Sequence, residues 1–388
     1  MKKNAKRDTT DFYFKRLARS HILALEPYSP GMVHEDAETV RISANENGFG
    51  APPAVIEALK SRMMGDARLH RYPDITCTRI REALSEKYRF PPDWFLLGNG
   101  LDDVINMIAL SFLSPNDSVI IPAATFSAYT NASRMMGASP IIIPMRPDMS
   151  IDLDATADAI KSNTKIIFLC SPNNPTGTTI KRNEFDSFLE KLAHMPAQPI
   201  LLVDHAYVDF DRPAGDSVNA IKYMNGFTNL AVLRTFSKLS GLAGLRAGYI
   251  IARPSMLSYI YRVRPPYTVN SIAQESALID LTDESVKLFK DNARGIIIAG
   301  RERLEDFLKD SGITYVPSKA NFVFAFYDKP YEEHVKAANE LAKRGILVRA
   351  LKHDKAPSGL RFSIGTTEEN EKLIAALKEI ISAGIFGK

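Results

Sequence analysis

The sequence predicts an α/β protein, with a large, doubly wound, mostly parallel sheet domain and a smaller α+β domain. Three features of its 388 residues support this fold class. Short apolar runs recur through the middle of the chain, helix-like stretches separate several of them, and beyond about residue 265 the pattern changes to longer amphipathic helices and a compact mixed segment. Hydrophobic residues make up 45% of the chain, enough for a sizeable core.

Six apolar runs show little alternation between polar and apolar positions, which is typical of strands buried on both faces. They are residues 118–121, 140–144, 165–169, 200–203, 230–233 and 248–251. The stretches 152–161 and 182–193 between them have helical character. Strands separated by helices in this way predict a parallel sheet with helices on both faces.

The last third of the chain predicts a second, smaller domain. Its expected elements are helices at 271–281 and 285–308, strands near 322–325 and 360–364, and a final helix near 368–383. The predicted limits are 50–265 for the large domain and 266–388 for the small one. Residues 1–49 would form an N-terminal arm that joins the small domain or reaches another subunit.

The net charge of +4 is mild for this length, and much of it lies in the first twenty residues. The basic residues there are Lys2, Lys3, Lys6, Arg7, Lys15, Arg16 and Arg19. Binding of nucleic acid or membrane is one interpretation of this segment. We favour a solvated N-terminal helix lying on the protein or on a partner subunit, with no nucleic-acid partner, because no basic stripe recurs downstream.

The two cysteines, Cys77 and Cys170, are too few for a disulfide framework and fit a reducing compartment. No CxxC motif or Cys/His cluster has metal-ligand spacing, so we expect no metal site. The basic N-terminus lacks the apolar segment of a signal peptide, and no run of eighteen apolar residues could span a membrane. We therefore expect a cytoplasmic protein with no membrane partner.

Three predicted strand ends carry reactive groups, and ligands of open parallel sheets bind at the carboxyl ends of the strands. At the first, Asp204 directly follows the run 200–203 and Tyr207 lies three residues on. A carboxylate there needs a cation or several donors, and a protonated ring nitrogen would serve. Asp204 could equally be the N-cap of a helix.

The second strand end carries Lys238, thirty-four residues beyond Asp204, which is about one strand–helix crossover. Both side chains should therefore open onto the same edge of the sheet. A desolvated lysine can lose its proton and form a Schiff base. Arg246, Thr235 and Ser237 offer a guanidinium fork and hydroxyls suited to a phosphate. The alternative is a surface lysine and arginine in a glycine-rich loop.

The third strand end is a loop in which residues 171–178 read SPNNPTGT. Two prolines, two asparagines and a glycine within it predict a rigid turn. Asn174 could donate a hydrogen bond to an oxygen on a ring. A turn that binds no ligand has a similar composition, but rarely this order.

These three motifs together resemble those of fold-type-I aminotransferases, and more narrowly those of the histidinol-phosphate aminotransferase family. They are SPNNPTGT, Asp204-x-x-Tyr207, and Ser237-Lys238 with Arg246. Further matches follow in the family's order over nearly the whole chain: YSPG at 28–31, SANENG at 43–48, RYPD at 71–74, GNGLDD at 98–103, RPPY at 264–267, GILVR at 345–349 and LRFSIG at 360–365. So many matches in order indicate the family's fold and its cofactor, pyridoxal 5'-phosphate.

The resemblance implies how the cofactor ring would be held. Lys238 would bind it as a Schiff base and shuttle protons, and Asp204 would pair with the protonated pyridine nitrogen. Asn174 and Tyr207 would hold the phenolic oxygen. Phe126 would stack on the ring, although the residue taken alone favours a core aromatic.

The resemblance also implies a phosphate site and a homodimer. The cofactor phosphate would lie at the backbone amides of Leu101 and Asp102, at the start of a predicted helix, with Ser237 and Arg246 completing the site. Tyr72 would reach this phosphate from the neighbouring subunit. The active sites of a homodimer would therefore be shared.

On the substrate side, the resemblance gives roles to three residues. Arg361 would bind the α-carboxylate through a bidentate contact, Arg349 would face the far end of the substrate, and Tyr28 would lie over the entrance. Ordinary surface charges and a packed aromatic are the alternatives for these positions.

Three other residues depart from the family pattern. His205 stands where Glu is common, Gly48 where Pro is usual and Thr268 where Asn is usual. We interpret His205 as a residue at a helix start and not as a catalyst. Gly48 and Thr268 lie near the expected substrate region, so they leave the identity of the substrate open, and not that of the cofactor.

The predicted activity is reversible transamination, with histidinol phosphate as the favoured amino donor and 2-oxoglutarate as the acceptor. An aromatic amino-acid aminotransferase and a phospho-amino-acid decarboxylase are the alternatives, because one cofactor shell serves all three reactions. A cofactor-sensing regulator is a non-enzymatic alternative, which would normally need a DNA-binding domain, and the sequence indicates none.

Overall fold

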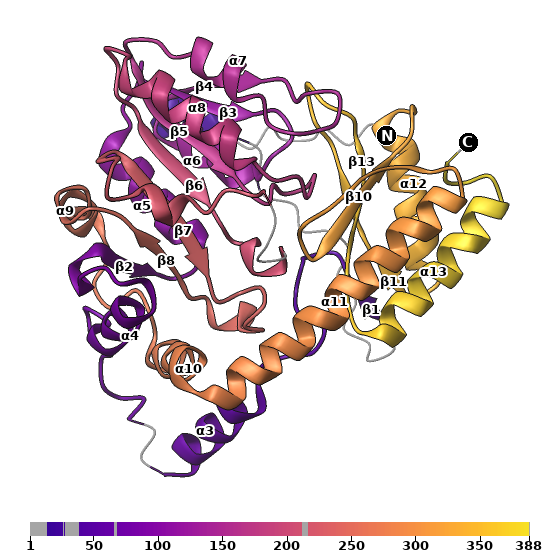
Figure 1. Ribbon diagram of the computed structural model, residues 1–388, viewed down its shortest axis with the longest axis horizontal. Helices are drawn as coiled ribbons and strands as arrows, with labels where there is room; N and C mark the ends of the chain where they lie inside the picture. Colours follow the sequence, from indigo (N-terminus) through magenta and orange to yellow (C-terminus); the bar gives the residue numbers. More distant parts are fainter. Residues whose placement is uncertain (1–13, 26, 28–38, 66–67, 212–215, 388) are drawn as a thin grey trace, which may run out of the picture.

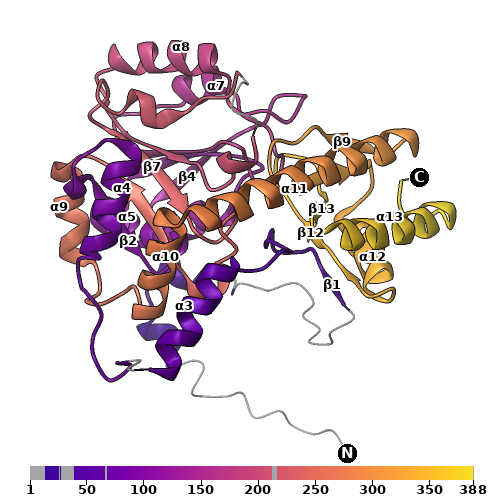
Figure 2. The same cartoon turned by 60° about the horizontal axis from the view of Figure 1, so that its bottom comes forward.

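The computed structural model describes residues 14–25, 27, 39–65, 68–211 and 216–387. Two domains, each with its own sheet, make up this part of the chain (Figure 1). The large domain contains a seven-stranded sheet and the small one a four-stranded antiparallel sheet. A helix of 27 residues, α11 (Glu284–Asp310), runs from one domain to the other in both views (Figure 2).

The strands of the large sheet lie in the order β2-β8-β7-β6-β5-β3-β4. They are β2 (Phe95–Gly98), β3 (Ser118–Pro122), β4 (Ser139–Ile143), β5 (Thr164–Cys170), β6 (Ile200–Asp204), β7 (Leu230–Thr235) and β8 (Gly248–Ile251). Neighbours from β7 to β4 run parallel, whereas β8 is antiparallel to both β7 and β2. The predicted fold class is confirmed. Of the seven strands of this sheet, the sequence prediction missed only β2, whose four residues FLLG are too few to show a period.

Alternate residues of the strands face two separate cores, which is why the apolar runs are nearly continuous. In β5, Ile166 and Phe168 face the core that contains α5, α6 and α9, while Ile167 and Leu169 face the core that contains α4, α7, α8 and α10. The helices that pack around this sheet are α3 (Pro53–Met64), α4 (Thr78–Tyr88), α5 (Leu101–Phe112), α6 (Ser127–Met135), α7 (Leu153–Asp158), α8 (Arg182–Ala193), α9 (Pro254–Val263) and α10 (Ser271–Thr282), with 3₁₀ turns η1 (Pro92–Trp94), η2 (Val208–Phe210), η3 (Ala220–Tyr223) and η4 (Ala243–Leu245).

The small domain packs helices on an antiparallel sheet of order β12-β13-β10-β9. Its elements are β9 (Thr314–Val316), β10 (Phe322–Phe326), α12 (Tyr331–Ala342), β11 (Ile346–Leu347), β12 (Arg349–Leu351), β13 (Gly359–Ser363) and α13 (Thr367–Ser382). A capping box starts α13, because Thr366 accepts from the Glu369 backbone while Glu369 accepts from the Thr366 backbone. The expected strands and final helix of this region are confirmed to within a few residues.

The N-terminal part of the chain contacts both domains. Strand β1 (Val40–Arg41) pairs in parallel with β11 of the small domain, and the short helix α2 (Ser20–Leu23) packs against α6 of the large one. Helix α10 packs on α3 and α4. The domain limits at residues 50 and 266 stay predictions. Within the residues that the structure describes, no helix is long and apolar enough to cross a membrane.

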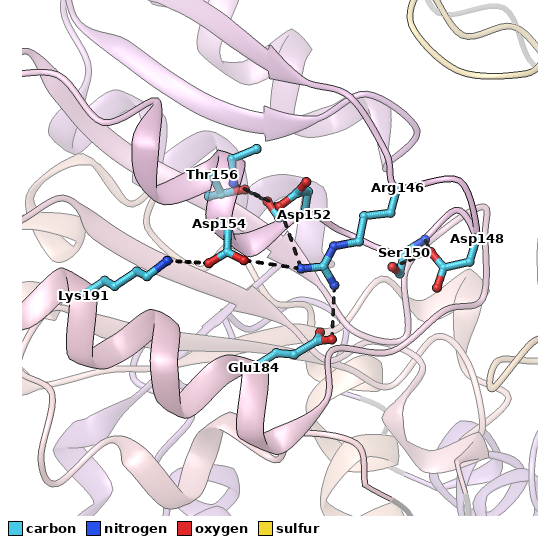
Figure 3. Close-up of polar contacts among 9 residues, drawn as sticks. Arg146, Asp148, Ser150, Asp152, Asp154, Thr156, Glu184 and Lys191 are labelled. Atoms are coloured by element: carbon cyan, nitrogen blue, oxygen red, sulfur yellow. Dashed lines mark hydrogen bonds and ion pairs between the residues drawn. The ribbon is translucent and has the colours of Figure 1, made fainter.

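An ion-pair network on the large domain joins the loop after β4 to α7 and α8 (Figure 3). At its centre, Arg146 Nη1 lies 3.1 Å from Glu184 Oε1, and Nη2 lies 3.8 Å from Asp152 Oδ1 and 4.0 Å from Asp154 Oδ2. Lys191 Nζ lies 2.5 Å from the other Asp154 oxygen. The pair of Lys191 and Asp154 is solvent-exposed, and exposed pairs stabilise a fold only weakly.

Candidate active site

The candidate site lies at the carboxyl ends of three neighbouring strands, as the sequence predicts. Asp204 is the last residue of β6, the loop with Asn174 follows β5, and Lys238 follows β7. Lys238 Nζ lies 5.5 Å from the centroid of the Tyr207 ring, which follows β6. From the small domain, Arg361 on β13 reaches Asn174 with a hydrogen bond of 2.6 Å.

Asp204 is a buried carboxylate with two hydrogen bonds. Its Oδ2 accepts from the Tyr129 hydroxyl at 2.6 Å and its Oδ1 accepts from the Ala206 amide at 2.9 Å. It does not cap a helix, because the next element, η2, starts only at Val208. Burial raises the pKa of Asp204 to about 6 despite both hydrogen bonds. A cation placed against this carboxylate, such as a protonated ring nitrogen, would restore its ordinary ionisation.

Lys238 has the properties of a nucleophilic amine. Its Nζ donates to the Ala44 carbonyl at 3.2 Å. Burial, followed by the nearby positive charges of Arg361 and Arg246, lowers the pKa of Lys238 to about 8. About a tenth of the amine is therefore neutral at pH 7 and able to attack an aldehyde.

The start of α5 forms an anion cradle that two glycines keep open. Gly100 has φ +84°, and a Cβ there would lie 2.6 Å from Nη2 of Arg246. A Cβ on Gly248 would lie 2.8 Å from the Leu101 amide nitrogen. The N-cap residue Gly100 has no side chain to cap this helix, so it leaves the backbone amides of Leu101 and Asp102 available to an anion. Nη2 of Arg246 also lies 3.4 Å from Asp102 Oδ2.

Thr235, Ser237 and Phe126 have local contacts that fix their positions. The Thr235 hydroxyl accepts from the Ser237 amide at 3.0 Å, which fixes the turn between β7 and Lys238. Phe126 precedes α6 and meets Tyr129 edge-on, with ring centroids 5.6 Å apart. The buried carboxylate, the depressed amine and the cradle together suit a phosphorylated pyridine aldehyde, and pyridoxal 5'-phosphate is such a molecule.

The two arginines assigned to substrate lie opposite each other on neighbouring strands. Arg349 on β12 is the cross-strand partner of Arg361 on β13. Besides Asn174, Arg361 contacts the Ser43 carbonyl at 2.6 Å, and its guanidinium lies 5.6 Å from the centroid of the Phe322 ring. Arg361 is buried and Arg349 is half-buried.

Two predicted site residues do not join this cluster. Tyr72 is 80% exposed and stacks on Tyr267, with ring centroids 4.4 Å apart. Its contacts in the described part of the chain therefore lie on the surface, and not at the cradle. Tyr28 lies outside the described residues.

The structure gives the positions of two residues that depart from the family pattern. The Thr268 hydroxyl donates to Asp103 in the first turn of α5 at 2.9 Å, and its nearness to the substrate stays a prediction. His205 is not at a helix start: it lies buried between β6 and η2, where its Nδ1 bonds the Ser171 carbonyl and its Nε2 accepts from the Ala220 amide. Burial lowers the pKa of His205 to about 4, although the bond to the Ser171 carbonyl acts in the opposite sense, so the ring is neutral at neutral pH.

Sequence reasoning missed three buried residues that support the site. Tyr129 bonds Asp204, and its place three residues after Phe126, one turn along α6, was the available signal. Asn173 ties the SPNNPTGT loop to the Phe126 loop by donating to the Ala124 carbonyl at 2.7 Å. Asn45 donates to the Tyr207 hydroxyl at 3.0 Å, and it had no local signal beyond its place in SANENG.

No metal-binding cluster accompanies these groups. Across the described residues, no group of three or more His, Cys, Asp and Glu side chains could hold a metal ion.

Comparison with known proteins agrees with the geometry of this edge. Residues 37–377 match the family of class I and II aminotransferases. A histidinol-phosphate aminotransferase of Symbiobacterium thermophilum is 35% identical over 374 residues, covering 94% of this chain and 99% of that protein, and one of Moorella thermoacetica is 34% identical over 372 residues, covering 94% and 93%.

Solved structures show the same fold. A Sinorhizobium meliloti histidinol-phosphate aminotransferase in complex with pyridoxal-5'-phosphate has a TM-score of 0.83 at 24% identity, covering 94% of this chain and 97% of that one. An aspartate aminotransferase of Thermus thermophilus with maleate has a TM-score of 0.79 at 20% identity, covering 95% and 99%. The chain therefore belongs to the histidinol-phosphate aminotransferase family, within the class I and II aminotransferases that use pyridoxal 5'-phosphate.

Proposed function

We propose that this aminotransferase takes its amino group from histidinol phosphate and passes it to 2-oxoglutarate. The observation that supports this proposal is the cross-strand pair of Arg349 and Arg361. Guanidinium groups bind phosphates and carboxylates through charge-assisted, often bidentate contacts. A phosphate dianion, or the two carboxylates of 2-oxoglutarate, could engage both arginines, whereas a neutral aromatic amino acid offers a single carboxylate.

In this proposal the residues at the sheet edge divide the work on the cofactor. When bound, pyridoxal 5'-phosphate supplies an electron sink for the carbon that carries the amino group. Lys238 Nζ would hold the cofactor and then move a proton from that carbon, and Asp204 would keep the ring nitrogen protonated. Tyr207 and Asn174 would donate to the phenolic oxygen.

The remaining cofactor residues would fix the phosphate and the ring. The amides of Leu101 and Asp102 would donate to the phosphate, together with Ser237, Thr235 and Arg246. Phe126 would stack on the ring face opposite to the approaching donor, which holds the ring against rotation.

We further propose a homodimer in which Tyr72 belongs to the partner's site. Exposed apolar side chains lie on the same segment and on α3, and exposed apolar surface often marks interaction sites. They are Ile56, Met63, Met64, Leu69 and Ile75, and Tyr267, which stacks on Tyr72, is also exposed. A cytoplasmic location is proposed as well, since Cys77 and Cys170 are both buried free thiols whose pKa burial raises.

Substrate preference tests the proposed donor. Arg349→Gln should lower kcat/KM for histidinol phosphate by about ten- to a hundredfold, because a charge-assisted contact contributes roughly 1.5–3 kcal/mol. It should change kcat/KM for phenylalanine little. Arg344→Gln is the matched control, because Arg344 pairs with Glu340 and Glu379 on the surface.

The alternatives give opposite results in the same assay. Wild-type protein that ignores histidinol phosphate but uses phenylalanine or tyrosine would be an aromatic aminotransferase. Carbon dioxide release from a phosphorylated amino acid would identify a decarboxylase. Either result would reject the proposed donor and leave the role of Lys238 intact.

A further inference from the structure

Asn45 connects the two domains beside the candidate active site. It is fully buried in the segment between β1 and α3, with φ +55°, a conformation that asparagine tolerates better than most residues. On the small-domain side, its backbone amide donates to the Ser363 hydroxyl of β13 at 2.9 Å. On the large-domain side, its Nδ2 donates to the Tyr207 hydroxyl at 3.0 Å.

These hydrogen bonds form a series with a fixed direction, because the series starts at the backbone amide of Asn45, which can only donate. The Ser363 oxygen accepts from that amide, so the Ser363 hydrogen is available for Asn45 Oδ1, 2.9 Å away. The amide of Asn45 is thereby oriented with Oδ1 toward Ser363 and Nδ2 toward Tyr207. A flipped amide would give the Ser363 oxygen two donors and leave its own hydrogen without this acceptor.

The direction of this series of hydrogen bonds determines where the Tyr207 hydroxyl can donate its hydrogen. Since the Tyr207 oxygen accepts from Asn45, its own hydrogen is directed to another partner. Burial raises the pKa of Tyr207, so the hydroxyl keeps that hydrogen at neutral pH. We propose that Asn45 is a positioning residue that makes Tyr207 a donor to the phenolic oxygen of the cofactor. This inference rests on the role of Tyr207 in the proposed function.

The same segment relates this device to substrate binding. Ser363 lies two residues after Arg361 on β13, so both side chains project from the same face of the strand. Arg361 donates to the Ser43 carbonyl, and Lys238 to the Ala44 carbonyl, on the residues just before Asn45. Three consecutive residues, Ser43, Ala44 and Asn45, therefore link Arg361 to Tyr207.

A cofactor analogue without the phenolic oxygen tests the proposal independently of turnover. The full-length chain is reconstituted with pyridoxal 5'-phosphate or with 3-deoxypyridoxal 5'-phosphate, and Kd is measured for each. The wild type should prefer the natural cofactor, and Tyr207→Phe should reduce this preference about tenfold, as expected for one charge-assisted hydrogen bond.

Two variants of Asn45 separate its orientation from its bulk. Asn45→Asp presents only acceptors to Tyr207, which would then donate to the new carboxylate, so the preference should fall as far as in Tyr207→Phe. Asn45→Gly tolerates φ +55° and removes the side chain, so the preference should fall about threefold, an intermediate loss. In the Tyr207→Phe background, neither change should reduce the preference further by more than about twofold.

The outcomes distinguish the role of Tyr207 from the role of Asn45. If Tyr207→Phe retains the wild-type preference, the role of Tyr207 in the proposed function is wrong. If Tyr207→Phe loses it while both folded Asn45 variants keep it, the inference about Asn45 alone is overturned. An Asn45→Asp loss that persists undiminished without the Tyr207 hydroxyl would also overturn it, because the new charge would then act directly. Thermal unfolding of each variant shows that the compared proteins are folded.

Discussion

The ion-pair network around Arg146 and the charged groups at the carboxyl edge of the sheet differ in how their charges are matched. In the network, every carboxylate meets a cation, and Asp154 is 68% exposed with a pKa lowered by its hydrogen bond to Lys191. At the sheet edge, burial moves the pKa values in the opposite sense, with Asp204 raised to about 6 and Lys238 lowered to about 8.

The difference indicates what each set of charges is for. The network satisfies its charges within the protein, so replacing one member should cost little. A ligand that carries a cation and an aldehyde would match the buried carboxylate and the buried amine at the edge. Perturbed pKa values of this kind are typical of functional sites.

The largest expected contrast is between the two lysines. Lys238→Ala should reduce transamination by at least about 10⁴-fold, because no other amine replaces Nζ as the cofactor anchor and proton carrier. Lys191→Ala should leave the rate within about twofold. Steady-state rates and the visible absorbance of the loaded protein measure both. A Lys238→Ala protein with near wild-type turnover would end the assignment.

Replacing the carboxylates should give the next largest contrast. Asp204→Asn removes the charge that keeps the ring nitrogen protonated, and kcat should fall about 10³-fold, equivalent to about 4 kcal/mol. Cofactor affinity should fall less than kcat. Asp154→Asn serves as the control on the surface network. Equal kcat in the two variants would mean that Asp204 has only a structural role.

Stability against pH should separate the two carboxylates further. In the cofactor-free protein, the pKa of Asp204 is raised from 3.8 to about 6, so the folded state binds a proton more tightly than the unfolded state. Its contribution is complete below pH 3.8 and is lost as the pH rises through 6, by at most about 3 kcal/mol.

Denaturant titrations at several pH values measure this contribution. The wild type should gain stability relative to Asp204→Asn as the pH falls from 6 to 4. Relative to Asp154→Asn it should keep its stability over this range and lose it mainly below pH 3.8, because the pKa of Asp154 is lowered in the fold. The pKa of His205 is also shifted in this pH range, but His205 is present in all three proteins, so its contribution cancels in the stability differences. A constant difference from Asp204→Asn over this range would contradict the raised pKa.

Tyr72 tests whether a residue that is exposed in one chain belongs with the site groups. Mixing inactive Tyr72→Ala and Lys238→Ala proteins under subunit exchange should restore about a quarter of the wild-type sites, since half of the dimers would be mixed and each would carry one intact site. Tyr72→Ala alone must be severely impaired for this test. Absence of recovery despite verified exchange would place Tyr72 in its own chain's site.

The sequence carried enough information for the elements whose signals are local. Helix α8 coincides with the predicted 182–193, and the strand ends with Asp204 and Lys238 lie at one edge, as the spacing predicts. Tyr129 and Asn45 escaped prediction because their partners are distant: Tyr129 bonds a residue 75 positions away, and Asn45 bonds residues 162 and 318 positions away. The bond of Thr268 to Asp103 on α5 likewise had no local signal, because the two residues are 165 positions apart.

Helix α11 has a mechanical consequence for this enzyme. Its 27 residues form a continuous rod of about 40 Å that the two domains share. A tilt of about 5° at its large-domain end would displace the other end by about 3–4 Å, roughly the length of one hydrogen bond. A slight rotation of the small domain, carried along this helix, can therefore make or break the contacts of Arg361 and Ser363.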